Sequence, residues 1–310
     1  MLAARRYALL LIAALLMLAV GCPPLSGRGG GDDDDDANDD DSAGDDDDAT
    51  GDDDDATGDD DDATPPLSWT TLWATSKSAT GDPSAVQLIT LDPVNGAELS
   101  RMALGGDAAE AGGTNGLAWA PDQSALYVVT RGSSKKGGGV RTLGTVDTAT
   151  GAVTNIGELG DAVADIAFGP DGTLYAVTGQ LGDGPRLFSV DTSTGALTQI
   201  GSPLINDQAS RDGEALAFDP GTNMLYRMSG NDPYDFYSVD PATAAETAIT
   251  LSGVAERSEA TAMTHDPNSG LIHWVDRDQQ LYSVDTAGVQ ALVGPAAIDK
   301  TFAKGLSWGP

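Results

Sequence analysis

The stretch Val190-Asp191-Thr192-Ser193-Thr194-Gly195 decides the fold, because the chain repeats it in similar form five times. The other copies begin at Leu91-Asp92, Val146-Asp147, Val239-Asp240 and Val284-Asp285. Successive aspartates lie 55, 44, 49 and 45 residues apart. Repeats of this length are supersecondary units that bury their faces only against their neighbours, and the spacing is typical of propeller blades. The sequence therefore predicts a β-propeller.

Each repeat also contains short runs of β-branched and aromatic residues between turn residues, which predict strands. The first run of each repeat ends in a large residue preceded by a small one; these runs are Gly116–Trp119, Asp165–Phe168, Ala215–Phe218, Ala260–Met263 and Gly305–Trp308. Successive side chains of a strand point to opposite faces. Each blade is therefore expected to present a bulky face to one neighbour and a flat face to the other.

The two ends of the repeat region complement each other. Thr70–Trp73 reads as a second strand that lacks its first, whereas Gly305–Trp308 reads as a first strand that lacks its successors. Pairing these two segments closes the ring and leaves no open sheet edge. We therefore expect an all-β, five-bladed propeller over residues 67–310, closed by N- and C-terminal strands in one shared blade.

The repeat resembles the secreted propeller families of the YVTN and NHL kind, whose blades carry a Leu-Tyr-x-Val-Asp-x-x-Thr-Gly hairpin. In this chain the motif is carried by the third strands, whose Leu-Phe-Ser-Val or Leu-Tyr-Ser-Val runs lead into the aspartate turns at Asp191 and Asp285. The resemblance covers residues 67–310 and implies a shape. It implies no reaction, because such blades share turn chemistry across unrelated activities.

The N-terminus predicts export. Arg5 and Arg6 precede thirteen apolar residues, too few to span a bilayer as a helix, so residues 1–21 read as a signal peptide. Leu18–Cys22 resembles a bacterial lipobox, which implies that Cys22 becomes a lipidated N-terminus. Pro23 follows it in place of Asp, and by analogy with enteric lipoproteins this favours the outer membrane. We expect an exported protein anchored to the bacterial envelope through Cys22.

Residues 22–66 contain 20 aspartates and hardly any apolar side chain. Such a segment has nothing to offset the entropy of ordering it, so a disordered, charge-stretched stalk is expected. Calcium capture is the alternative for these carboxylates, although contiguous aspartates lack the turn glycines of calcium loops. Residues 67–310 carry 13 Lys and Arg against 28 Asp and Glu, a net charge near −15. Nucleic acid is therefore disfavoured as a partner.

Residues that commonly perform catalysis are scarce. His265 and His273 are the two histidines and Cys22 is the only cysteine. We interpret His265 as part of a turn and His273 as a second-strand residue in the position of Val128, both away from the propeller axis and structural in role. The sequence assigns no catalytic residue and no metal ligand.

The polar residues at the start of the first strands are the candidate ligand site, since the loops of a propeller converge there on its axis. They are Asn115, Asp165, Glu214, Glu259 and Lys304, with Arg211 and Arg257 just upstream of the glutamates. The alternative is that these residues form Glu-Lys and Glu-Arg ion pairs with one another and line a solvated channel without binding a ligand.

Two functions remain. We expect a monomeric, non-catalytic binding module for a protein, peptide or glycan. The alternative is a metal-dependent propeller hydrolase, lactonase- or glycosidase-like. In it, Glu214, Glu259, Asn115 and Asp165 would hold a divalent metal such as Ca²⁺, as in the gluconolactonase-like propellers, or two carboxylates would act as acid and base on a sugar. Lys304 would repel a metal at that axis, and the blade count departs from the gluconolactonase-like pattern.

Overall fold

The computed structural model describes residues 67–76, 86–109, 111–132, 140–179, 184–205, 214–229, 235–254, 258–296 and 303–310. All of them belong to one compact unit, Ala63–Pro310. The predicted signal peptide, Cys22 and the aspartate tract lie outside the described residues. The part of the chain that is described forms strands and turns only. It contains no helix of the length and hydrophobicity needed to cross a bilayer.

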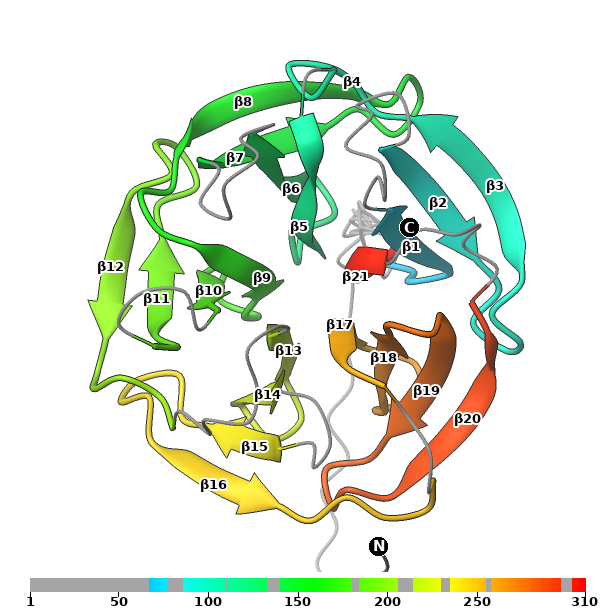
Figure 1. The fold of residues 1–310 in the computed structure, drawn as a ribbon, viewed down its shortest axis with the longest axis vertical. Coiled ribbons are helices and arrows are strands. Elements are labelled where there is room, and N and C mark those ends of the chain that lie inside the picture. The colour runs from blue at the N-terminus through cyan, green and yellow to red at the C-terminus, as the bar shows by residue number, and fades with distance from the viewer. Residues whose placement is uncertain are drawn as a thin grey trace, which may run out of the picture. The chain divides into compact units, whose positions relative to one another are not determined.

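Five sheets surround a central axis (Figure 1), each with four antiparallel strands, so the five-bladed propeller is confirmed. Blade 1 has the strand order β21-β1-β2-β3, and blade 2 the order β5-β6-β7-β8 with a short β4 beside β8. Blades 3, 4 and 5 are β9–β12, β13–β16 and β17–β20. The chain thus fills the disc blade by blade and returns to the blade in which it began.

The strands occupy four concentric layers. The innermost are β5 (Ala111–Trp119), β9 (Val163–Phe168), β13 (Glu214–Asp219), β17 (Ala260–His265) and β21 (Ala303–Gly309). The second are β1 (Thr71–Ser76), β6 (Leu126–Gly132), β10 (Leu174–Thr178), β14 (Met224–Ser229) and β18 (Ile272–Asp276). The third are β2 (Gln87–Leu91), β7 (Arg141–Val146), β11 (Leu187–Val190), β15 (Asp235–Val239) and β19 (Gln280–Val284). The outermost are β3 (Glu98–Ala103), β8 (Ala152–Glu158), β12 (Leu197–Ile200), β16 (Glu246–Ile249) and β20 (Gln290–Pro295), with β4 (Gly105–Gly106) beside β8.

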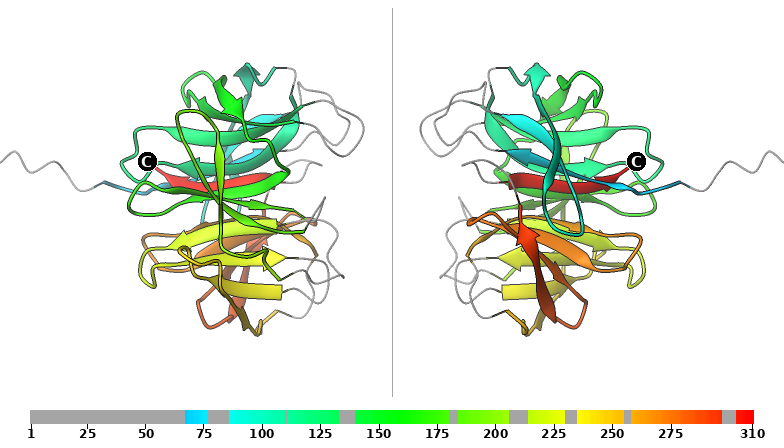
Figure 2. Two further views of the ribbon diagram at one scale, coloured as in Figure 1. Left: turned by 90° about the vertical axis from the view of Figure 1, so that its left-hand side faces the viewer. Right: turned by 90° about the vertical axis from the view of Figure 1, so that its right-hand side faces the viewer.

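The predicted closure is confirmed. β21 pairs antiparallel with β1 in a register that places Trp308 opposite Leu72 and Ser307 opposite Trp73. The Thr70 amide adds a hydrogen bond of 2.9 Å to the Gly309 carbonyl. Figure 2 shows that β21 ends on the face of the disc from which the chain enters β1. We call this face, on which all five inner strands end, the turn face.

The repeated aspartate shapes the turn between the third and fourth strands. In blade 2, Asp147 accepts hydrogen bonds from the Ala149 amide at 2.9 Å and from the Thr150 hydroxyl at 2.8 Å. Gly151 closes the turn at a φ of +73°, where a Cβ would collide with the carbonyl of Ala103 in blade 1. Glycine is therefore required here for two reasons: the backbone is left-handed, and the neighbouring blade leaves no room for a side chain.

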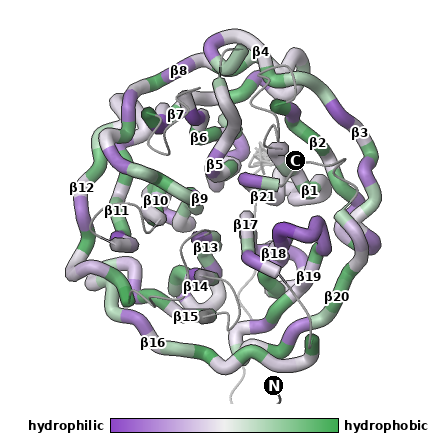
Figure 3. The backbone as a smooth tube through the Cα atoms, viewed as in Figure 1, coloured by the Kyte–Doolittle hydropathy of each residue, from purple (hydrophilic) through white to green (hydrophobic). Residues whose placement is uncertain are grey.

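Aromatic pairs fill the seams between blades, as the alternation of large and small residues predicts. Tyr127 of blade 2 meets Phe168 of blade 3 with ring centroids 5.3 Å apart, and Tyr175 of blade 3 meets Phe218 of blade 4 at 5.9 Å. Each of these tyrosines lies opposite a small inner-strand residue, as Tyr127 does opposite Ala118. The core is thus divided among the blade interfaces. The outermost strands mix hydrophobic and hydrophilic residues and face solvent (Figure 3).

Candidate functional site

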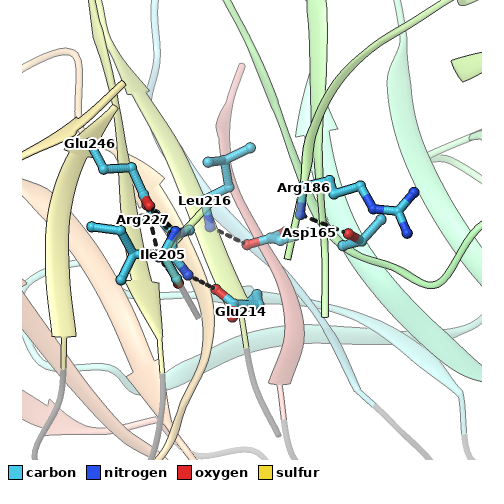
Figure 4. A network of polar contacts seen from close by, with 8 residues as sticks. Asp165, Arg186, Ile205, Glu214, Leu216, Arg227 and Glu246 are labelled. Atoms are coloured by element: carbon cyan, nitrogen blue, oxygen red, sulfur yellow. Dashed lines mark hydrogen bonds and ion pairs between the residues drawn. The ribbon is translucent and has the colours of Figure 1, made fainter. Parts of the chain in front are cut away.

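Glu214, at the start of β13, is held in a buried ion triad. Arg227 of β14 donates from Nη1 to Glu214 Oε2 at 2.8 Å and from Nε to Glu246 Oε1 at 2.8 Å (Figure 4). The guanidinium side chain is 0% exposed and both carboxylate side chains are 2% exposed. Burial opposes the charge, but the two glutamates together raise the pKa of Arg227. Glu214 therefore links strands of blade 4 through Arg227.

Asp165 joins blades instead of facing a ligand. Its carboxylate accepts hydrogen bonds of 2.9 Å from the Ile166 amide in blade 3 and from the Leu216 amide in blade 4 (Figure 4). The residue is 0% exposed. Burial raises its pKa well above the usual range, while these amides and the charge of Lys304 act in the opposite direction.

The remaining residues of the sequence-based candidate set differ in their surroundings. Glu259 pairs with Arg277 at 3.0 Å. Asn115 and Lys304 are partly exposed on β5 and β21, and Arg211 and Arg257 lie outside the described residues. The charge of Lys304 acts on Asp165, whose carboxylate also accepts from the Leu216 amide of the neighbouring blade. Within the described ranges, no group of three or more Asp, Glu, His or Cys residues is placed to hold a metal.

A pocket of about 240 Å³ lies instead at the turn face, where the last residues of all five inner strands form its wall. Its aromatic lining comes from Trp69, Trp119, Phe168, Phe218 and Trp308. Four prolines that follow the inner strands complete the rim, namely Pro121, Pro170, Pro220 and Pro267. Such a concave, largely apolar site with a few polar groups is the usual form of a small-molecule pocket.

His265 is the titratable side chain of this wall, which corrects its assignment to a turn. β17 continues through His265, so this residue, and not Met263, corresponds to Trp119 and Phe168. Its Nε2 lies 3.3 Å from Oδ1 of Asp219 in the neighbouring blade. Burial lowers the pKa of His265, while Asp219 and Asp266 oppose the shift. The neutral ring with its proton on Nε2, toward Asp219, leaves Nδ1 as a hydrogen-bond acceptor.

His273 also differs from its sequence-based placement. It pairs with Thr264 as Tyr127 pairs with Ala118, so it occupies the tyrosine position and not that of Val128. Trp308 Nε1 donates to its Nδ1 at 3.3 Å, across the seam between blades 5 and 1. Burial lowers its pKa. This histidine therefore stabilises the ring closure.

The hydroxyl groups in the pocket wall are engaged with the backbone of neighbouring inner strands. Ser307 Oγ accepts from the Trp119 amide at 2.9 Å and donates to the Trp308 carbonyl at 3.1 Å. Thr264 Oγ1 lies 3.4 Å from the Trp308 amide, which donates to it. Both hydroxyls thus link inner strands of adjacent blades.

The chain enters the propeller at the edge of the pocket. The Ser68 carbonyl accepts a hydrogen bond from Gln123 Nε2 at 2.7 Å, and the Trp69 carbonyl accepts one from Asn268 Nδ2 at 2.7 Å. These donors belong to the turns of blades 2 and 5, which flank the closing blade. Trp69 is thereby fixed as part of the pocket wall.

Comparison with known proteins finds similarity only among solved structures, at low sequence identity. No known protein-family profile and no curated protein matches the chain. Among solved structures, TolB from Acinetobacter baumannii is similar over 73% of this chain and 53% of its own, at 16% identity and a TM-score of 0.47. The S511A mutant of puromycin hydrolase complexed with PGG is similar over 73% of this chain and 36% of its own, at 16% identity and a TM-score of 0.43. The chain thus spans about half the length of the first protein and about a third of the second.

Proposed function

We propose that the protein is an envelope lipoprotein whose propeller is a non-catalytic binding module, with its ligand in the axial pocket of the turn face. One observation carries this proposal. The ends of five inner strands, each from a different blade, jointly form an apolar pocket with aromatic walls. A site built from every blade is fixed in shape by the whole ring, which favours binding because little freedom is lost when the ligand enters.

The polar groups favour binding over catalysis. His265 and Asp219 resemble the base and orienting acid of a catalytic triad. However, the Ser307 and Thr264 hydroxyls accept hydrogen bonds from backbone amides. The carboxylates of Glu214 and Glu259 are paired with Arg227 and Arg277, which disfavours the metal-dependent hydrolase.

Anchoring through Cys22 is supported by the sequence alone. Several acyl chains on one residue hold a protein at a membrane, since each buried CH₂ contributes about 0.8 kcal/mol. Growth with a clickable palmitate analogue is expected to label the native protein and not the Cys22→Ser variant. Equal labelling of both would refute the anchor while leaving the binding module untouched.

A neutral aromatic probe tests the pocket. Phenethyl alcohol is expected to bind the mature protein with a stoichiometry of one, to change its tryptophan emission and to raise its melting temperature, because a ligand of the folded state stabilises that state. The Trp69→Ala variant removes one pocket wall and is expected to weaken binding several-fold. Leu67→Ala is the matched control, since Leu67 lies two residues away and is 49% exposed. A probe that fails to saturate, or that binds Trp69→Ala as well as the native protein, would exclude this pocket.

A further inference from the structure

A second hollow of about 490 Å³ adjoins the axial pocket between blades 2 and 3. The two hollows share Pro121, Phe168 and Pro170, so they form one continuous surface. Their characters differ, because Asp122 and Asp171 line the second hollow together with Ser124 and Thr192. The apolar well is thus bordered, through these shared residues, by a hollow that two carboxylates line.

Tight turns hold these two carboxylates in place. Asp122 Oδ1 accepts from the Ser124 amide at 3.0 Å and from its hydroxyl at 2.6 Å. Asp171 accepts from the Thr173 amide and hydroxyl, each at 3.0 Å. The bonds from Ser124 lower the pKa of Asp122, so this carboxylate stays charged over the neutral range. Each carboxylate has further lone pairs for a ligand.

No basic residue offsets these charges locally. Among the described residues that line the two hollows there is neither a lysine nor an arginine. Among these lining residues, His265 is the one that can become cationic, and burial lowers its pKa. The sequence of the propeller as a whole carries a net charge near −15. An anionic ligand is therefore repelled from this face, and a cationic one is attracted to it.

We propose that the axial pocket binds a small organic cation, with the apolar body of the ligand in the well and its ammonium or amidinium group between Asp122 and Asp171. This inference rests on the proposed binding function and specifies its ligand. The aromatic walls suit such a ligand as well, because indole and phenyl rings attract cations through their faces. A bare metal ion fits poorly, since a hard dication requires six or more oxygen ligands and the second hollow offers two carboxylates.

The size of the charge effect can be anticipated. A carboxylate about 4 Å from a cation in water gives roughly a fivefold gain in affinity, so two give at most about 25-fold. Screening by salt and the residual hydration of exposed charges reduce this gain. We expect phenethylammonium to bind about tenfold more tightly than phenethyl alcohol at about 0.05 M NaCl. The anion 3-phenylpropionate is expected to bind more weakly than the alcohol.

Calorimetric titration of the mature protein with these three probes is the test. In an Asp122→Asn/Asp171→Asn variant, phenethylammonium should lose its advantage while the affinity for the alcohol stays unchanged. Asparagine retains the oxygen that accepts the turn amides, so the fold is preserved. The control is Asp240→Asn, which alters an aspartate turn between the third and fourth strands of blade 4 that lines neither hollow. The control should keep the cation preference.

The outcomes separate the two proposals. If the alcohol binds in the pocket but the cation binds no better, the charge inference is overturned and the binding module stands. Equal loss of cation preference in Asp240→Asn would also overturn it, because the effect would then come from net charge alone. If none of the three probes binds, the axial pocket itself is excluded as a ligand site.

Discussion

Removing the last strand is expected to abolish cooperative folding. Residues 303–310 contribute β21, the innermost strand of blade 1 and its hydrogen-bonded partner to β1. Leu306 and Trp308 are 1% and 6% exposed, and Trp308 also contacts His273 across the seam with blade 5. Truncating one such side chain costs about 2–5 kcal/mol. Losing the whole strand is therefore expected to remove most or all of the roughly 5–15 kcal/mol that typically stabilises a domain.

Urea titration followed by near-ultraviolet circular dichroism measures this effect. The chain that ends at residue 302 should show no sigmoidal transition, whereas deletion of the exposed Pro310 alone should leave the midpoint unchanged. A synthetic peptide of residues 303–310, added in excess, should restore part of the tertiary signal because β1 keeps its free edge. A native transition in the truncated chain would show that the ring does not need its C-terminal strand.

The second large effect is expected for Arg227→Met. This change leaves Glu214 and Glu246 without their shared cation although both side chains are 2% exposed. It also removes a hydrogen bond to the Ile205 carbonyl and the stacking of the guanidinium over Tyr237, 4.8 Å from the ring centroid. Breaking a buried ion pair from one side costs about 3–5 kcal/mol.

Two comparisons isolate the cause of this loss. Arg101→Met breaks a partly exposed pair with Glu98 and should cost less than about 1 kcal/mol. A triple variant with Glu214→Gln and Glu246→Gln added to Arg227→Met should recover part of the stability, because no buried charge is then left unpaired. A cost for Arg227→Met as small as that for Arg101→Met, measured by urea denaturation, would contradict the role assigned to the triad.

The architecture was predictable because it depends on backbone chemistry that repeats in sequence. Asp147 and Gly151 mark a turn whose hydrogen bonds are local, so the phrase itself carries the structure. Likewise, the closure follows from two incomplete blades at the ends of one repeat array, and Trp308 lies opposite Leu72 in the same pair of strands.

The pocket was missed because the ligand site was predicted at the starts of the inner strands, and one repeat was also aligned two residues out of register. Matching Met263 to Trp119 by size placed His265 in a turn, whereas the strand ends at His265. A better frame was present in the sequence. The last large residue of each inner strand precedes a proline by two positions, as Trp119 precedes Pro121 and His265 precedes Pro267. That spacing places His265 at the end of its inner strand.

Other features depended on contacts that no spacing shows. Glu246 reaches Arg227 from an outer strand two positions away in the sheet, so the triad becomes apparent only after the strands are paired. Asp165 and Glu214 were predicted as axial ligand residues, but spacing did not show that Asp165 accepts from the Leu216 amide and that Glu214 pairs with Arg227. Burying a carboxylate is costly unless a hydrogen-bond donor or a cation contacts it, and these partners meet that requirement.

The two histidines provide the most direct test of the central claim, that the turn-face pocket receives the ligand. In ¹⁵N-labelled protein they give two imidazole spin systems, and only His265 lines the pocket among the described residues. Titration with phenethyl alcohol should shift the Nδ1 resonance of His265 saturably, with the dissociation constant found by calorimetry, and leave His273 nearly unchanged. A probe that binds by calorimetry while His265 does not respond would place the ligand elsewhere and contradict the account.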